Sequence, residues 1–156
     1  LPSGFMTTIK AIEINGKNIE EAYSPMSVSV TLKDDMDISR GDMIVKENNV
    51  PIISQDLDLM ICWMDSADLK SRKKVIIKHT TNECLGMITE ILYKLDINTL
   101  HSIKDFEDFK LNDIGRIKIR SSKPLFFDSY KKNRHTGSII LIDPNTNATI
   151  AAGMII

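Results

Sequence analysis

The sequence predicts an all-β protein, and two observations lead to that prediction. First, β-branched aliphatic residues dominate the apolar set, because the 156-residue chain has 24 Ile and 5 Val but only 6 Ala. Ile and Val are stiff at χ1 and favour pleated strands over helices. Second, apolar and polar residues alternate with a period of two in several segments, as they do in strands that have one face in water.

The N-terminal strands are predicted from alternation and from the turns between them. Thr8–Ile14 is followed by Asn15-Gly16, a dipeptide typical of hairpin turns. Val28, Val30 and Leu32 alternate with hydroxyl-bearing residues. We therefore expect these three side chains to face a core.

The C-terminal part contains more predicted strands. Ile117 and Ile119 alternate with basic residues, which is the pattern of a half-solvated antiparallel strand. Turn-forming residues separate this segment from its neighbours. The other predicted strands are Leu57–Met64, Val75–His79, Ser138–Ile142 and Thr149–Ile155.

One segment, Thr80–Leu95, is ambiguous. Thr80 and Glu83 have the spacing of a helix capping box, and Leu85, Ile88 and later leucines recur at helical spacing. From the residues alone, a helix is slightly favoured over a long strand.

A linker divides the chain into two parts. The segment between Val45 and Asp56 begins with polar residues and contains Pro51, which favours a boundary near Val50. Residues 51–156 are enough for a complete six-stranded barrel, whereas residues 1–50 are too few to close one.

Composition and charge exclude several classes of protein. The formal net charge is −1, so no global field attracts nucleic acid or an anionic membrane. No apolar run reaches the roughly 18 residues of a membrane span, and Leu1–Gly4 lacks the order of a signal peptide. Cys62 and Cys84 form no CxxC pair and are expected to be free thiols. These features favour a cytoplasmic protein.

No pattern for catalysis, cofactor binding or metal binding is present. The chain has no GxxxxGK[ST] loop and no GxSxG elbow, and His79, His101 and His135 lack metal-ligand spacing. Two basic clusters, Lys70–Lys74 and Tyr130–His135, are interpreted as solvated loops. Binding of phosphate or of an acidic protein surface is the alternative for both clusters.

Short motifs run through the whole chain in a fixed order. They are Leu1–Gly4, Asp37–Asp42, Trp63, Lys78–Thr81, Thr136–Ser138, Ile142-Asp143 and Ala152–Ile155. Together they resemble the large, GTPase subunit of bacterial sulfate adenylyltransferase, which is related to translation-factor GTPases. The resemblance implies a C-terminal fragment. It would hold part of a domain II-like barrel (1–50) and all of a domain III-like six-stranded antiparallel barrel (51–156), with Thr80–Leu95 a strand.

The resemblance also implies a function. In that family a small subunit makes adenosine 5′-phosphosulfate from ATP and sulfate, and GTP hydrolysis by the large subunit drives this step. We therefore expect an enzyme as the parent protein and a supporting, non-catalytic role for this chain. GTP and magnesium would belong to the missing GTPase domain, and the partners would be that domain and the small catalytic subunit. The alternatives are an elongation-factor-type barrel that binds aminoacyl-tRNA and a free-standing β interaction domain.

Five residues form a candidate interface. His79, Thr80 and Thr81 match a His-Thr pair that elongation-factor relatives carry on a barrel edge. Arg134 and Thr136 lead into the penultimate predicted strand. The resemblance implies that these residues contact a subunit or a domain, and for Arg134 and Thr136 the alternative is a turn held by an Arg salt bridge.

Three further expectations are structural. Arg40, Gly41 and Asp42 are predicted to form a turn in which Asp42 caps backbone donors. Trp63 is predicted to be a core or inter-barrel anchor. An incomplete first barrel would leave unpaired backbone beside four residues and favour a homodimer. These residues are Ile9, Ile12, Val28 and Val30.

Overall fold

The computed structural model describes residues 1–156, and its regular elements are all β-strands, which confirms the predicted fold class. The chain divides into two compact units, Leu1–Asp42 and Met43–Ile156, each of which is described by itself. No helix is long and apolar enough to cross a membrane.

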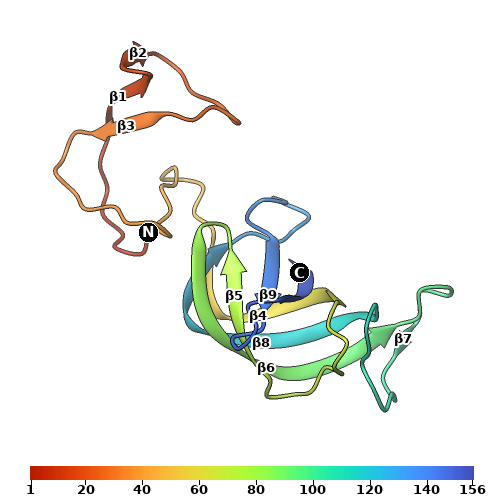
Figure 1. The fold of residues 1–156 in the computed structure, drawn as a ribbon. Helices are drawn as coiled ribbons and strands as arrows, with labels where there is room; N and C mark the ends of the chain where they lie inside the picture. The colour runs from red at the N-terminus through yellow and green to blue at the C-terminus, as the bar shows by residue number, and fades with distance from the viewer. The chain divides into compact units, whose positions relative to one another are not determined.

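The N-terminal unit is a three-stranded antiparallel sheet in the order β2-β1-β3 (Figure 1). Asn15 and Gly16 both have positive φ, at 49° and 75°, which is the backbone of a type I′ hairpin turn. The strands of this unit are β1 (Ile9–Ile14), β2 (Lys17–Ile19) and β3 (Ser29–Leu32).

Two expectations for this sheet are wrong. Ile9 and Ile12 lie on the central strand, and Ile12 pairs with both Ile19 and Val30, so the open edges are β2 and β3. Val30 does not face a core, because 40% of its surface is exposed. The alternation correctly located the strand, but three strands leave both faces of the sheet without a covering layer of their own.

The C-terminal unit is a closed antiparallel barrel, which confirms that prediction. Six strands follow one another in the order β5-β9-β10-β4-β8-β6, and pairing of β5 with β6 closes the ring (Figure 1). The short strand β7 extends the far end of β6. The strands are β4 (Ile52–Trp63), β5 (Lys74–His79), β6 (Asn82–Leu95), β7 (Ser102–Ile103), β8 (Ile114–Phe127), β9 (Ser138–Ile142) and β10 (Thr149–Ile155).

The strand-free segment before the barrel both begins and ends earlier than the predicted linker. Strand β4 begins at Ile52, because Ile52 and Ile53 pair with Phe127 and Phe126 of β8. The strand-free segment therefore spans residues 33–51, and it contains both the division between the two units, at Asp42 and Met43, and the predicted boundary at Val50.

The ambiguous segment is strand β6, so the helical interpretation is wrong and the one implied by the resemblance is right. Alternate residues from Asn82 to Ile88 point into the barrel, which is the period of a strand and not of a helix. Glu83 caps no helix and instead lies 3.4 Å from the Lys78 ammonium across the β5–β6 hairpin.

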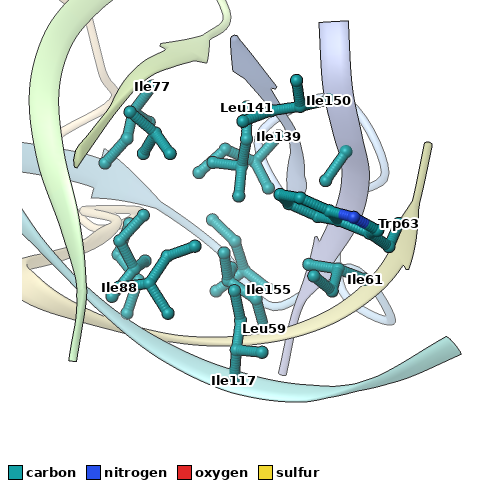
Figure 2. Close-up of a cluster of buried hydrophobic side chains, with 14 of the residues drawn as sticks. Leu59, Ile61, Trp63, Ile77, Ile88, Ile117, Ile139, Leu141, Ile150 and Ile155 are labelled. Carbon is teal, nitrogen blue, oxygen red and sulfur yellow. The ribbon is translucent and has the colours of Figure 1, made fainter. Parts of the chain in front are cut away.

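The barrel interior is filled by aliphatic side chains from all six strands, which point toward one another (Figure 2). Trp63, at the end of β4, has 0% of its surface exposed and donates its indole N–H to the Ala67 carbonyl oxygen at 2.8 Å. This burial confirms that Trp63 is a core anchor. The labelled core residues are Leu59, Ile61, Trp63, Ile77, Ile88, Ile117, Ile139, Leu141, Ile150 and Ile155.

Candidate functional site

The candidate interface lies at the end of the barrel where the β5–β6 hairpin meets the loop between β8 and β9. His79 is the last residue of β5, and only 2% of its surface is exposed. Its Nε2 lies 2.7 Å from the carbonyl oxygen of Thr136. The Thr136 hydroxyl in turn donates to a carboxylate oxygen of Asp128 at 3.0 Å. The buried histidine thus ties the hairpin to the loop.

Thr80 and Thr81 form the two-residue connection between β5 and β6. Thr80 has a φ of 52°, a backbone conformation that β-branched residues rarely adopt. Its hydroxyl donates to the carbonyl oxygen of His79 at 2.7 Å, so a local hydrogen bond supports the unusual backbone. Both threonines are exposed at the hairpin tip.

The β8–β9 loop is held by its own side chains. The Lys132 ammonium lies 2.7 Å from Asp128 and, together with the Thr136 hydroxyl, lowers the pKa of that carboxyl group. The Arg134 guanidinium lies over the Tyr130 ring, 5.9 Å from its centroid, in cation–π geometry. Gly137 is required here, because a Cβ atom would collide with the backbone of Tyr130.

The structure therefore brings the five candidate interface residues to one end of the barrel. His79 and Thr136 are in direct contact through Nε2 and a carbonyl oxygen. Thr80, Thr81 and Arg134 are exposed around them. The inner polar groups hydrogen-bond to one another, so this end is suited to fixing loop positions and presenting side chains to a partner.

The turn residues Arg40, Gly41 and Asp42 lie in the other unit. The backbone N–H of Asp42 donates to the Ser39 carbonyl oxygen at 3.0 Å, and the Asp42 carboxylate accepts from the Ser39 N–H, also at 3.0 Å. Gly41 has a φ of 103°, which only glycine adopts without strain. This geometry suits a structural turn.

The two basic clusters lie at opposite ends of β5. Lys70–Lys74 leads into that strand, whereas the loop containing Tyr130–His135 contacts His79 at its end. Within the first cluster Lys73 lies 3.6 and 3.5 Å from the carboxylates of Asp65 and Asp143, and 5.6 Å from the Trp63 ring centroid. The two clusters therefore do not form one continuous basic surface.

The outer face of the barrel carries a shallow apolar groove of about 350 Å³ over β4, β9 and β10. Its lining includes Met60, Cys62, Ile140 and Met154. Both cysteines are free, and burial raises the pKa of the Cys84 thiol. No group of three or more His, Cys, Asp or Glu side chains is arranged to hold a metal ion.

The sequence analysis did not identify the loop Asp96–His101, which connects β6 to β7 and exposes Ile97 and Leu100. A signal for this loop was present in the sequence. Asp-x-Asn-Thr occurs at residues 96–99 and again at residues 143–146.

Comparison with known proteins confirms the resemblance that the ordered motifs indicated. The chain is 48% identical over 157 residues to the bifunctional enzyme CysN/CysC of Mycobacterium tuberculosis (strain ATCC 25618 / H37Rv), which covers 100% of this chain and 26% of that protein. It is 44% identical over 157 residues to sulfate adenylyltransferase subunit 1 of Bacteroides fragilis (strain YCH46), covering 100% of this chain and 33% of that protein. The chain thus spans about a quarter to a third of the length of these relatives.

A solved structure and a family model agree on the fold. Sup35 complexed with GMPPNP superposes with a TM-score of 0.86 at 16% identity, covering 100% of this chain and 38% of that one. The family model for GTP-eEF1A C-terminal domain-like proteins matches residues 56–156, which include nearly all of the closed barrel. The chain therefore belongs to the GTP-eEF1A C-terminal domain-like family.

Proposed function

We propose that this chain is the C-terminal β-barrel region of the large subunit of a GTP-dependent sulfate adenylyltransferase. The observation that carries the proposal is identity of 40% to 48%, along the whole chain, to proteins named sulfate adenylyltransferase subunit 1 or CysN/CysC. The parent protein would then be a cytoplasmic enzyme of sulfate assimilation that supports synthesis of adenosine 5′-phosphosulfate from ATP and sulfate.

The role of this chain within that enzyme is supporting and not catalytic. The chain has no GxxxxGK[ST] loop to cradle a nucleotide phosphate, so GTP and Mg²⁺ would be held by a GTPase domain elsewhere in the parent protein. The polar groups at the His79 end of the barrel are engaged with one another. They can fix the shape of a contact surface but are not poised as a nucleophile and a base.

The partners would be the small catalytic subunit and the GTPase domain. In this proposal the exposed side chains of Thr80, Thr81 and Arg134 make the contact. His79 and Thr136 hold the hairpin and the loop in position behind them. This division of roles follows from burial, because a side chain with 2% exposure offers no surface to a partner.

Binding of aminoacyl-tRNA is the weaker alternative. The likeness to Sup35 concerns the fold, which both functions share. The separated basic clusters favour weak, salt-sensitive attraction to RNA over a continuous binding track.

A competition experiment tests the proposal. The small subunit and a full-length large subunit are assayed for adenosine 5′-phosphosulfate formation while excess purified 156-residue chain is added. The chain should occupy the small subunit and lower the rate in a concentration-dependent manner, without forming product or hydrolysing GTP by itself. A rate that is unchanged at saturating chain, together with no binding by calorimetry, would refute the proposal.

Matched arginine variants test the candidate interface. Arg134→Glu should weaken the competition by about tenfold, as expected for an interface arginine. Arg120→Glu is the control, because Arg120 is also exposed but pairs with Asp56 on the wall of the barrel. If both substitutions weaken the competition equally, Arg134 is not an interface residue.

A further inference from the structure

The apolar groove over β4, β9 and β10 takes its shape from the side chains of three neighbouring strands. On β10, Ala152 pairs with Ile140 of β9 and with Cys62 of β4, so a short side chain lies between two larger ones. In the next row of the sheet Met154 pairs with Met60 of β4. All five residues line the groove. The short Ala152 side chain therefore leaves a hollow between bulkier apolar groups.

The groove fits an α-helix and offers no place for an added strand. Strands β9, β10 and β4 each pair on both sides, so none of them has a free edge. A partner must therefore be recognised through side chains, as when an amphipathic helix lies in an apolar groove. Three neighbouring strands span about 10 Å, which is close to the diameter of a helix, about 10 to 12 Å. Met60 and Met154 suit such a contact, because unbranched thioether side chains adapt to the surface packed against them.

The cations at the two sides of the groove are already neutralised. On the β8 side, Arg116 donates to both carboxylate oxygens of Asp58, at 2.8 and 2.6 Å. On the β5 side, the Lys78 ammonium lies 3.4 Å from the Glu83 carboxylate. Neither cation is therefore left to attract a charged partner.

The end of the groove next to the β8–β9 loop is different, because its cations have no carboxylate partner. Tyr130 lines the groove, and the Arg134 guanidinium lies over the Tyr130 ring. Ser138 also lines the groove and donates its hydroxyl to the Arg134 carbonyl oxygen. In this loop Lys132 pairs with Asp128, whereas the exposed Lys131 and Arg134 form no ion pair. The groove is thus apolar along its length and positive at one end, which complements an apolar surface that ends in a carboxylate.

We propose that the groove binds an amphipathic helix of a partner protein, with apolar side chains over Ala152 and Met154 and an acidic residue against Arg134. A protein segment is favoured over a small molecule, because small-molecule sites enclose most of their ligand and this groove is shallow. A membrane is disfavoured, because membrane-bound surfaces insert apolar side chains into the lipid, whereas these side chains line a hollow. The occupant is defined by this chemistry and not by the identity of the parent enzyme, so the inference does not rest on the proposed function.

Binding of a designed peptide to the 156-residue chain tests the groove. The probe is a fluorescein-labelled peptide of about 18 residues, long enough to form a helix, with leucines at helical spacing and one glutamate in its first turn. A matched peptide has glutamine in place of the glutamate. Fluorescence anisotropy should show saturable binding of both peptides, tighter for the acidic one by about threefold to fivefold, as expected for one exposed ion pair. Arg134→Gln should remove this preference and leave binding of the glutamine peptide unchanged.

Three substitutions distinguish the groove from nonspecific binding to apolar surface. Met154→Gln makes a groove side chain polar at similar volume, and Ala152→Leu fills the hollow with an apolar group. Each should weaken binding of both peptides by about tenfold. Met87→Gln is the control and should leave binding unchanged, because Met87 is 39% exposed, as Met154 is, but lies on β6 outside the groove. Thermal unfolding followed by Trp63 fluorescence checks that each variant is folded.

Several results would overturn the inference. They are no saturable binding up to about 1 mM chain, equal effects of Met154→Gln and Met87→Gln, and an unchanged preference for the acidic peptide in Arg134→Gln. Binding of the unaltered chain to phosphatidylglycerol vesicles that is lost in Met154→Gln would identify a membrane as the occupant and would also overturn it. None of these measurements involves the small subunit, so the groove and the proposed function can fail independently.

Discussion

The closed barrel and the N-terminal sheet of the same chain are built from similar alternating sequences but differ in burial. In the barrel every one of six strands pairs on both sides, and inward residues such as Leu59 and Ile117 are completely buried. In the sheet only β1 pairs on both sides, and no residue of 1–42 is buried. Closure, which removes edges and creates an interior, therefore decides whether an alternating strand gains a core.

The largest expected difference comes from an aromatic substitution in each unit. Trp63→Ala should lower the unfolding free energy of the barrel by about 3 to 5 kcal/mol, because it empties a fully buried site. Tyr23→Ala, in the N-terminal unit, should change the unfolding free energy by less than about 0.5 kcal/mol, since Tyr23 is 69% exposed. Urea unfolding followed by circular dichroism measures both. A loss below about 1 kcal/mol for Trp63→Ala would contradict the assignment of Trp63 as the core anchor.

Glycine substitutions should give a smaller difference of the same kind. A Cβ atom at Gly115 would collide with the Tyr93 carbonyl oxygen and the Phe109 ring, so Gly115→Ala should cost the barrel about 2 to 3 kcal/mol. Gly16 has nothing within 4 Å, and its positive φ is the one constraint on it. Gly16→Ala should therefore leave the barrel transition, seen by Trp63 fluorescence, unchanged. A shift of equal size for both variants would show that the two units unfold together.

Acid should lower the stability of the barrel, because several of its carboxyl groups have lowered pKa values. Lys132 lowers the pKa of Asp128, and backbone N–H groups lower those of Asp96 and Asp143. A carboxyl group whose folded pKa lies below its ordinary value of 3.8 stabilises the fold above that pH, and this contribution is lost as the pH falls through the folded pKa. The melting temperature of the barrel should thus fall below about pH 4. Asp128→Asn should make the melting temperature depend less on pH. An unaltered pH profile in this variant would contradict the assigned contribution of the Asp128 carboxylate.

The smallest expected effect is weak self-association of the sheet. Its edges β2 and β3 carry unpaired backbone groups, so we expect a concentration-dependent dimer through the N-terminal unit. Val30→Lys places a charge on the β3 edge and should remove the dimer. Analytical ultracentrifugation over a range of concentrations measures this. A chain that stays monomeric at high concentration would exclude edge pairing.

Local patterns predicted most strands but misled in two places. In β6, Leu85 and Ile88 have the spacing of one helical face, yet Ile88 points into the barrel and Leu85 is exposed on its outside. Register shifts near Ile88 and Ile91 interrupt the alternation that would have marked a strand. The alternation of Val28, Val30 and Leu32 predicted strand β3, which begins one residue after Val28, but it carried no information on whether a second layer covers the strand.

The candidate site was harder to predict, because its contacts join distant parts of the chain. His79 and Thr136 are 57 residues apart, and only closure of the barrel brings them within 2.7 Å. The loop Asp96–His101 had a local signal, the repeated Asp-x-Asn-Thr, which the sequence analysis overlooked.

Native-state hydrogen exchange of the whole chain at low concentration tests most directly the claim that closure, and not alternation, stabilises the strands. Amides of β4 and β8 should exchange only on global unfolding of the barrel. Amides of β1 to β3 should exchange at least about 1,000-fold faster, through local opening. Equal protection in both units of a monomeric chain would contradict this account, because it would mean that the sheet is as stable as the closed barrel.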